Sequence, residues 1–521
     1  MKRWDAVVVG SGATGGWVAK QLTEAGMEVL VLEAGPALAP SELPGARPPA
    51  PDDAWHARKP VQKRLSACNA ETQHLYVDDV DNPYTTPEDK PFDWFRGRQA
   101  GGRSVTWGAY ALRFSDVELK AASRDGVGED WPLSHEELAP FYDRVEELLG
   151  VWGTREGLPQ LPDSRFARTE PMTRGEELFK AAVEKRWPDR RVIHARSVID
   201  DDGGDGRWPV KTSQGSTLAA AMKTGRLTLR CGAVVRQVLH DPADGTARGV
   251  AFIDASTRRD EEALGRLVIL CASTIESARL LLNSRAPACP DGLGNSSGLL
   301  GRNLMDHPKL KVTGTVPALA GLPCAVSTAS RSVYVPKFRN VRERHEAFVR
   351  GYGIQACVQR HGAWSRGYAG QVPFGFWAAG EMLPRPENRV TIDPARTDAW
   401  GIPAARVECA FGRNELAMAA DMTAAMREMA QEVGFEVRHE GALSRPGSFI
   451  HEVGTARMGL DPARSVLNRF QQSWDVRNLF ILDGSGFVTS GCQNPTLTMM
   501  ALAVRACDFI VANREIGRGA G

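Results

Sequence analysis

A glycine-rich turn close to the beginning of the chain places the strongest constraint on its fold. Residues 5–9 read DAVVV and residues 28–33 read EVLVLE, and Gly10, Gly12 and Gly15 follow the first run as G-x-G-x-x-G. Both runs are short and rich in Val and Leu, as buried strands are, and the segment 14–26 between them has the length of a helix. This order predicts a β-α-β unit of the dinucleotide-binding type and therefore an α/β fold.

The residues of this unit also predict its ligand. Gly10 permits the tight turn, Gly12 lets the backbone approach a pyrophosphate, and Gly15 allows close helix–strand packing. Phosphates would then lie at the positive end of the helix. Glu33 follows Gly10 by 23 residues, where a carboxylate accepts hydrogen bonds from ribose hydroxyls and repels a 2′-phosphate. NADP is therefore disfavoured, whereas FAD and NAD both stay open.

The composition excludes several classes of protein. The chain has 521 residues, of which 42% are hydrophobic and 24% charged, a balance typical of globular proteins. The 64 basic and 63 acidic residues form no block of like charge, which argues against nucleic acid as a partner. No apolar run approaches the ~18 residues of a transmembrane helix, and no cleavage site follows the first apolar stretch. We expect a soluble, cytoplasmic protein.

The cysteines give no indication of a metal site or a disulfide framework. There are nine, and they are scattered along the chain. No C-x-x-C or C-x-x-C-H motif occurs among them, so neither a cysteine-bound metal nor a c-type haem is expected. This usage suits a reducing compartment.

The rest of the chain divides into segments of different character. Residues 36–52 are rich in proline and predict a surface arm, and residues 200–206 (DDDGGDG) predict a turn or loose loop. Residues 134–150 predict a pair of helices that begins at a capping box of Ser134 and Glu137. A second α/β stretch follows, with strands near 227–239, 249–254 and 266–273 and a helix to about 283.

Short β-like runs between residues 308 and 410 predict an inserted, mostly antiparallel sheet. After it, Asn414 is predicted to cap a helix that extends to about residue 433. Four methionines recur at helical spacing in this helix and are expected in the core: Met418, Met422, Met426 and Met429.

Three further motifs carry a family resemblance. Residues 96–110 read RGRQAGGRSVTWGAY, residues 451–459 read HEVGTARMG, and residues 483–498 read DGSGFVTSGCQNPTLT. Together with the N-terminal fingerprint that ends in LEAG, they stand in the order found in glucose–methanol–choline (GMC) oxidoreductases. The resemblance covers nearly the whole chain. Within the family the chain resembles bacterial gluconate dehydrogenase large subunits and glucoside 3-dehydrogenases, and around GGRSVTWG it resembles pyranose oxidases.

The resemblance implies a Rossmann-like FAD-binding domain assembled from discontinuous segments, with an inserted, mostly antiparallel substrate sheet flanked by helices. Residues 1–306 would form the FAD-binding domain, with a surface arm and cap segments at about 36–95 and 150–200. Residues 307–440 would form the substrate domain. Residues 441–521 would return to the FAD-binding domain and carry the catalytic residues.

The resemblance also assigns individual residues. His451 matches the catalytic histidine of the family and Asn494 its partner. The cofactor-binding positions that it implies are Gly10, Gly12, Thr14, Gly15, Glu33, Gly101, Gly102, Ser104, Thr106, Val235, Ala272, Asp483, Gly484, Pro495 and Thr496.

The implied chemistry is the oxidation of an alcohol. A neutral imidazole at His451 is suited to take the hydroxyl proton while the flavin N5 receives a hydride from the carbon. Asn494 has two interpretations: its amide orients the substrate oxygen, or it caps the helix that follows Pro495. His307, next to Asp306 in MDHPK, is expected to have a structural or boundary role. Trp107 and Phe487 would either line the flavin or fill the core.

Two departures from related chains bear on the cofactor and its electrons. Pyranose oxidases attach FAD covalently through a histidine, and Thr106 stands at that position here, so FAD is expected to be non-covalent. Glucoside 3-dehydrogenase-like chains carry a cysteine-rich segment where this chain reads DDDGGDGRWPVK, which argues against electron exit through an iron–sulfur cluster. Oxygen, an artificial acceptor and a protein acceptor all stay open, as do a partner subunit and periplasmic export together with such a partner.

The expected activity is the oxidation of a secondary alcohol on a sugar or glycoside, and the branch resemblance alone places it at C3. The alternatives are a non-sugar alcohol, a lyase that keeps FAD without net redox chemistry, and a non-catalytic family member. Five residues of the inserted sheet are candidates to face the substrate, without an assigned register: Gln355, His361, Phe374, Phe376 and Glu381.

Overall fold

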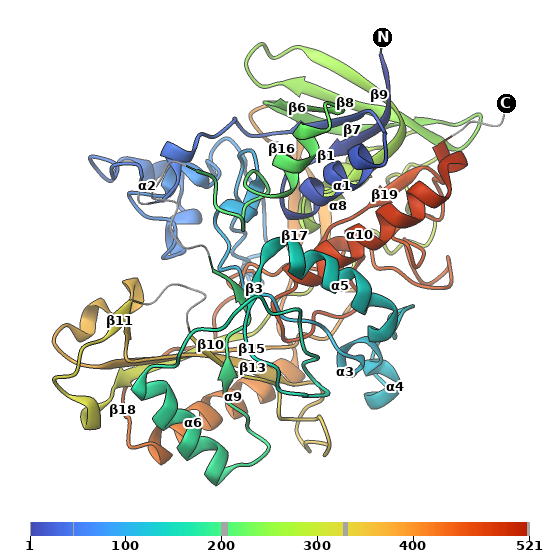
Figure 1. Cartoon of the computed structure of the whole chain (residues 1–521). Coiled ribbons are helices and arrows are strands. Elements are labelled where there is room, and N and C mark those ends of the chain that lie inside the picture. Colours follow the sequence, from blue (N-terminus) through green and yellow to red (C-terminus); the bar gives the residue numbers. More distant parts are fainter. Residues whose placement is uncertain (1, 45, 200–206, 327–331, 518–521) are drawn as a thin grey trace.

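The computed structural model describes residues 2–44, 46–199, 207–326 and 332–517 (Figure 1). The turn predicted at residues 200–206 lies outside the described residues. Two sheets organise the molecule. In Figure 1 the larger sheet lies in the upper part of the view, and the smaller one lies below it together with two helices.

The larger sheet has seven strands and contains the predicted β-α-β unit. β1 (Arg3–Val9) pairs in parallel with β2 (Val29–Glu33), and α1 (Ala13–Glu24) connects them. The parallel part also contains three strands from later in the chain: β6 (Leu227–Cys231), the second half of β9 (Asp260–Leu270) and β19 (Leu479–Ile481). β8 (Thr246–Asp254) and β7 (Ala233–Asp241) extend the sheet beyond the first half of β9 in antiparallel order.

Burial on both faces explains the continuous apolar runs of the first strands. Ala6 and Val8 of β1 pack in a core with residues of α1 and of α10 (Thr496–Ala512). Val7 and Val9 point to the other face and belong to the main core of the molecule. Strands that are buried on both faces read as unbroken hydrophobic segments rather than alternating ones.

The second sheet has six strands, all paired antiparallel, as predicted for the inserted segment. Its order is β18 (Glu436–Glu440), β10 (Lys309–Thr315), β15 (Pro373–Gly380), β13 (Tyr352–Val358), β12 (Val333–Val335) and β4 (Ile193–His194). Two helices pack on one face, α6 (Arg174–Arg186) and α9 (Arg413–Glu432). The four methionines of α9 are buried in this core, which confirms their predicted role.

The remaining elements are short or peripheral to the two sheets. The helices are α2 (Trp55–Arg58), α3 (Asp116–Leu119), α4 (Ala121–Asp125), α5 (His135–Leu149), α7 (Thr217–Lys223) and α8 (Thr274–Asn283). The strands are β3 (Val151–Trp152), β5 (Ser197–Val198), β11 (Ala325–Val326), β14 (Arg360–His361), β16 (Arg389–Thr397) and β17 (Pro403–Glu408). No helix among the described residues is long and apolar enough to cross a membrane.

The segment 134–150 forms one helix rather than the predicted pair. The capping box is present: the Glu137 amide donates to Ser134 Oγ at 3.3 Å, and the Ser134 amide donates to Glu137 Oε2 at 2.9 Å. Pro140 lies inside α5. Pro140 lies about one turn after the start of the helix. Its missing N–H removes one backbone hydrogen bond, and the helix continues.

Three other boundaries also differ from the prediction. Gly412, not Asn414, is the N-cap of α9, and Asn414 Oδ1 instead accepts a hydrogen bond from the Val349 amide at 2.9 Å. The predicted strand at 227–239 is divided at Gly232, whose φ of +70° ends β6 and begins β7. The last two β-like runs of the inserted segment form a separate hairpin, β16–β17, because Val390 and Val407 pack into the main core.

Candidate active site

A cavity of about 360 Å³ opens where the parallel strands β1, β2 and β9 end. In open α/β sheets this edge is where ligands bind. Most of the residues predicted to bind the cofactor line it: Gly10, Gly12, Thr14, Glu33, Gly102, Ser104, Thr106, Val235, Ala272, Asp483, Gly484, Pro495 and Thr496. His451 lies in the same lining. Gly15, Gly101 and Asn494 are not in this lining, but each has a neighbour that is. Gly15 lies against Gly10, Gly101 precedes Gly102, and Asn494 precedes Pro495.

The three glycines of the first turn have different surroundings. A Cβ added to Gly10, where φ is +102°, would lie 2.4 Å from the carbonyl oxygen of Cys271, and one added to Gly15 would lie 1.9 Å from that of Gly10. These two positions are closed by the packing of the protein itself. At Gly12 the nearest atom would be 3.9 Å away, so this backbone borders open space. That arrangement fits a diphosphate laid over Gly12 at the start of α1.

The second glycine cluster closes over the first. Gly101 and Gly102 have positive φ angles of +85° and +50°, and a Cβ on Gly102 would lie 3.2 Å from the Cα of Gly12. Ser104 Oγ donates to the Gly101 carbonyl at 2.6 Å and accepts from the Ser213 amide at 3.0 Å. The backbones of the two turns therefore lie close together at Gly12 and Gly102, both of which line the cavity.

Glu33 is held in place at the end of β2. Its Oε2 accepts hydrogen bonds from the Ser11 amide (3.1 Å) and hydroxyl (2.6 Å), and its Oε1 accepts from the Gly35 amide (2.9 Å). Burial raises the pKa of Glu33, against these hydrogen bonds, which lower it. A carboxylate has about four acceptor sites, so the three bonds leave room for a ribose hydroxyl. Ser11, which also accepts from the Gly101 amide at 2.9 Å, was not among the predicted residues.

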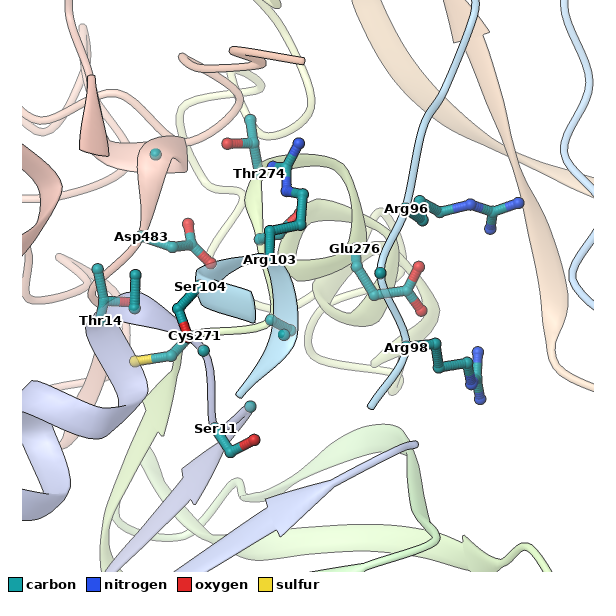
Figure 2. Close-up of a pocket in the computed structure, with 18 of the residues that line it drawn as sticks. Ser11, Thr14, Arg96, Arg98, Arg103, Ser104, Cys271, Thr274, Glu276 and Asp483 are labelled. Atoms are coloured by element: carbon teal, nitrogen blue, oxygen red, sulfur yellow. The ribbon is translucent and has the colours of Figure 1, made fainter. Parts of the chain in front are cut away.

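Two arginines and a glutamate near the cavity were also missed. Figure 2 shows Arg96, Arg98 and Glu276 on one side of the pocket and Thr14, Ser104 and Asp483 on the other, with the side chains of Arg96 and Arg98 extending away from the second group. Burial opposes the ionisation of Glu276, but the charges of Arg279, Arg98 and Arg96 outweigh it and lower its pKa. Arg96 Nε and Arg98 Nη2 are buried without a partner among the described residues. The signal for them was their position in RGRQAGGRS, directly before the second glycine turn.

His451 and Asn494 come together although 43 residues separate them. Asn494 Nδ2 lies 3.4 Å from His451 Nε2, and Asn494 Oδ1 accepts a hydrogen bond from Gln355 Nε2 at 3.1 Å. The N-cap of α10 is Pro495, and it makes no side-chain cap. The amide of Asn494 is therefore directed to the histidine rather than to the helix.

The surroundings of His451 favour a neutral imidazole. Burial lowers the pKa of His451 well below 6.5, and the nearby His307, Arg103 and Lys309 lower it further. Asp306 holds the loop, since its carboxylate accepts the backbone amides of Phe449 and His451, each at 3.1 Å.

His307 packs directly against the ring of His451. Its ring centroid lies 5.0 Å from that of His451, and its Nδ1 lies 2.9 Å from the Gly380 carbonyl oxygen, to which it donates. Burial lowers the pKa of His307 to about 4.

The other candidate residues differ in whether they lie near the cavity or in the core. Trp107 lines the cavity, whereas Phe487 is buried in the core against Phe114 and Trp131. Of the five candidates from the inserted sheet, Gln355 donates a hydrogen bond to Asn494. The others do not: Phe374 and Phe376 pack towards the helices, His361 is exposed, and Glu381 is buried against Lys337 and Arg350. The described residues contain no group of His, Cys, Asp or Glu that could hold a metal ion.

Known proteins match this chain over nearly its whole length. 2-Methyl-1,2-propanediol dehydrogenase of Mycolicibacterium austroafricanum is 30% identical over 97% of this chain and 95% of its own length. The fructose dehydrogenase large subunit of Gluconobacter japonicus is 27% identical, with 98% of each chain covered. A solved structure of Aspergillus oryzae formate oxidase, determined to study the effect of a mutation on FAD modification, has the same fold (TM-score 0.67, 14% identity, 99% of both chains).

The family models agree with the motifs. Residues 4–309 and 384–503 match the two models described as GMC oxidoreductase. FAD fits the cavity, because Gly12 borders open space and Glu33 keeps a free acceptor site at the end of β2. The chain belongs to the GMC oxidoreductase family and is an FAD-dependent oxidoreductase that acts on alcohols.

Proposed function

We propose that the protein oxidises a secondary alcohol of a sugar or glycoside to the ketone, with His451 as the base. The observation that carries the proposal is the half-buried His451, which lines the dinucleotide cavity, has a lowered pKa, and has its Nε2 3.4 Å from Asn494 Nδ2. A base must be unprotonated at the working pH and within reach of the hydroxyl group. The depressed pKa of His451 meets the first condition.

The residues divide the work as follows. Bound FAD supplies the acceptor for the hydrogen of the carbinol carbon. His451 Nε2 takes the proton of the substrate hydroxyl, and the Asn494 amide donates a hydrogen bond that orients the same oxygen. Both side chains are half-buried, which limits the access of water and strengthens these contacts. Glu33 and the two glycine turns bind the cofactor, and Thr106, which has no nucleophilic ring nitrogen, leaves it non-covalent.

We assign residues 1–306 and 441–521 to the FAD-binding domain and residues 307–440 to the substrate domain. The pairing of β19 with β9 supports the first assignment, and β10, β12, β13, β15 and β18 of the six-stranded sheet support the second. Within residues 307–440 the hairpin β16–β17 packs on the main core instead. β4, at residues 193–194, pairs with β12, so one short strand of the cap segment also belongs with the substrate sheet.

The substrate class rests on relatives. The fructose dehydrogenase subunit favours a sugar, and C3 as the oxidised carbon rests on resemblance to the glucoside 3-dehydrogenase branch. A second candidate is a non-sugar alcohol, because 2-methyl-1,2-propanediol dehydrogenase is 30% identical. A sugar panel and a diol panel separate the two.

The test is anaerobic mixing of the purified, FAD-loaded protein with glucose, glucosides, gluconate, fructose and simple alcohols and diols. A true substrate should bleach the visible flavin absorbance, and His451→Ala should slow this bleaching ~100-fold or more. Readmission of air then shows whether oxygen is the electron acceptor.

His361→Ala is the matched control, because His361 is exposed and lies on β14. It should bleach at the wild-type rate. Equal bleaching by wild type and His451→Ala would refute the role of His451. A yellow protein that no hydroxyl compound bleaches would favour a lyase.

A further inference from the structure

Three side chains from distant parts of the sequence form a hydrogen-bonded row that ends at His451. Gln355, on β13 of the six-stranded sheet, donates from Nε2 to Asn494 Oδ1 at 3.1 Å, and Asn494 Nδ2 lies 3.4 Å from His451 Nε2. Among the described residues the side chain of Asn494 has no other hydrogen-bond partner. Gln355 is therefore the group that decides which way this amide points.

The orientation of the amide has a chemical consequence. An amide presents an acceptor at one end and two donors at the other. Because Gln355 occupies the oxygen of Asn494 with an N–H, the NH₂ end is turned to His451. A donor facing Nε2 is compatible only with a lone pair on Nε2. The single proton of the neutral ring is then on Nδ1, which is the tautomer that a base at Nε2 requires.

We propose that Gln355 is a positioning residue that selects this tautomer of His451 by fixing the amide of Asn494. The inference deepens the proposed function and rests on it, since it assumes that His451 Nε2 takes the substrate proton. The hydrogen bond from Gln355 to Asn494 also connects the six-stranded sheet to the segment that precedes α10. Gln355 lies on the face of this sheet opposite α6 and α9. Its register partners on that face are Trp377 and Tyr334.

The native charged and titratable groups around His451 stay in place in every variant, and Gln355→Glu adds one carboxylate that Gln355→Met does not. Arg103 extends from the second glycine turn towards the Ile450 carbonyl oxygen (3.0 Å) and Glu452 (2.8 Å). Asp306 and His307 precede β10, and Lys309 begins it. None of them contacts Asn494. A change at residue 355 therefore alters the amide and leaves these charges in place.

The experiment compares Gln355→Glu with Gln355→Met. The carboxylate of Gln355→Glu cannot donate to Asn494 Oδ1, so the amide turns its oxygen to His451 and stabilises a proton on Nε2. We expect the acid limb of the pH profile of flavin bleaching to move to higher pH, and the plateau rate to fall at least ~10-fold. Gln355→Met removes the donor without adding charge, so the plateau should fall while the acid limb moves less.

Two further readouts separate positioning from loss of structure. Spectra of protein labelled with ¹⁵N-histidine, with His451 assigned by its absence in His451→Ala, should show Nε2 gaining proton character in Gln355→Glu. FAD content and Tm should match wild type in both variants. Gln371→Glu makes the same substitution at an exposed site just before β15 and should change none of these quantities.

The outcomes distinguish the inference from the function beneath it. If both Gln355 variants keep the wild-type rate, acid limb and histidine spectrum while His451→Ala is inactive, Gln355 does not position the base and the proposed function stands. A lower plateau with an unchanged acid limb and spectrum in Gln355→Glu also overturns the inference. If His451→Ala is as active as wild type, the proposed function itself is wrong.

Discussion

At the scale of single residues, the protein favours the neutral form of two adjacent histidines, the buried His307 and the half-buried His451. His307 is 1% exposed, and its only ring donor is used on the Gly380 carbonyl oxygen. His451 lies against it, and His307 lowers the pKa of His451 further. Two adjacent neutral rings are stable at neutral pH, because neither has to hold a positive charge in a poorly solvated environment.

The stability of the protein should therefore depend on His307 in mildly acidic solution. Its pKa is about 4 in the folded chain and 6.5 when exposed. As the pH falls from 6.5 to about 4, the unfolded chain binds a proton that the folded chain does not, so the free energy of unfolding falls, by roughly 3 kcal/mol at most. His307→Asn keeps an N–H for Gly380 but cannot titrate, so its Tm should fall less than that of wild type between pH 7 and pH 4.

The buried carboxyl groups have the opposite effect on the free energy of unfolding as the pH falls, and they are present in both wild type and His307→Asn. Burial raises the pKa of Glu33, Asp306, Asp483 and Glu452, so their protonation favours the folded chain as the pH falls. The difference between wild type and variant isolates His307. His361→Asn, at an exposed site, should behave as wild type. Equal Tm losses in wild type and His307→Asn would contradict this account.

Motifs predicted the residues whose chemistry is local, and they missed those defined by distant contacts. Gly12 and Glu33 could be placed from the turn and the strand that carry them. Arg96 and Arg98 precede the second glycine turn in sequence, but only the folded chain brings them to the cavity lining together with Glu276. Gln355 was a candidate without an assigned register. Its role depends on a contact with Asn494, which lies 139 residues away in sequence.

At the scale of elements, the capping box of α5 is a local feature with a measurable effect. Ser134→Ala removes the acceptor of the Glu137 amide, and loss of such a cap costs about 1 kcal/mol. That corresponds to roughly five-fold faster hydrogen exchange in the first turn of α5. Mass spectrometry of the peptide that spans residues 134–141 measures it. Ser134→Asp, which restores an acceptor, should exchange as wild type, and an unchanged rate in Ser134→Ala would refute the cap.

The same elements show where local patterns mislead. Ser134 was predicted correctly because its partner Glu137 lies three residues away. Asn414 has the residue type of a cap, but tertiary structure recruits its side chain to the Val349 amide, and the cap falls to Gly412. β16 and β17 look like the strands before them, yet Val390 and Val407 complete the main core instead. In each case a long-range contact overrides the local preference.

At the scale of the whole molecule, a buried ionic cluster ties the substrate sheet to the rest of the chain. Lys337 Nζ lies 2.8 Å from Glu118 Oε1 on α3 and 3.3 Å from Glu381 Oε2 beyond β15, and Arg350 Nη1 lies 3.3 Å from Glu381 Oε1. All four side chains are at most 2% exposed. The desolvation of these charges is offset only while every partner is present.

Removal of one partner should therefore be costly. Lys337→Met leaves Glu118 without its cation and should lower the stability by about 3–5 kcal/mol, measured as a lower Tm of the FAD-loaded protein. Lys337→Met combined with Glu118→Gln should recover part of the loss, because Arg350 still balances Glu381. Arg427→Met breaks the exposed pair with Glu440 and should cost less than ~1 kcal/mol. A Lys337→Met variant no less stable than Arg427→Met would show that the cluster is not needed.

The pairing of β19 with β9 has a consequence for how the protein is made. A ribosome adds roughly 5–20 residues per second, so β19, at residues 479–481, leaves it on the order of half a minute to a minute and a half after β1. During that interval the second half of β9 is an unpaired hydrophobic edge, which is the kind of surface on which nascent chains aggregate. The cavity is also open until Asp483, Gly484 and α10 arrive. Cofactor capture therefore belongs to the last step of synthesis, and slow translation or chaperone supply, rather than FAD alone, should govern the yield of folded enzyme.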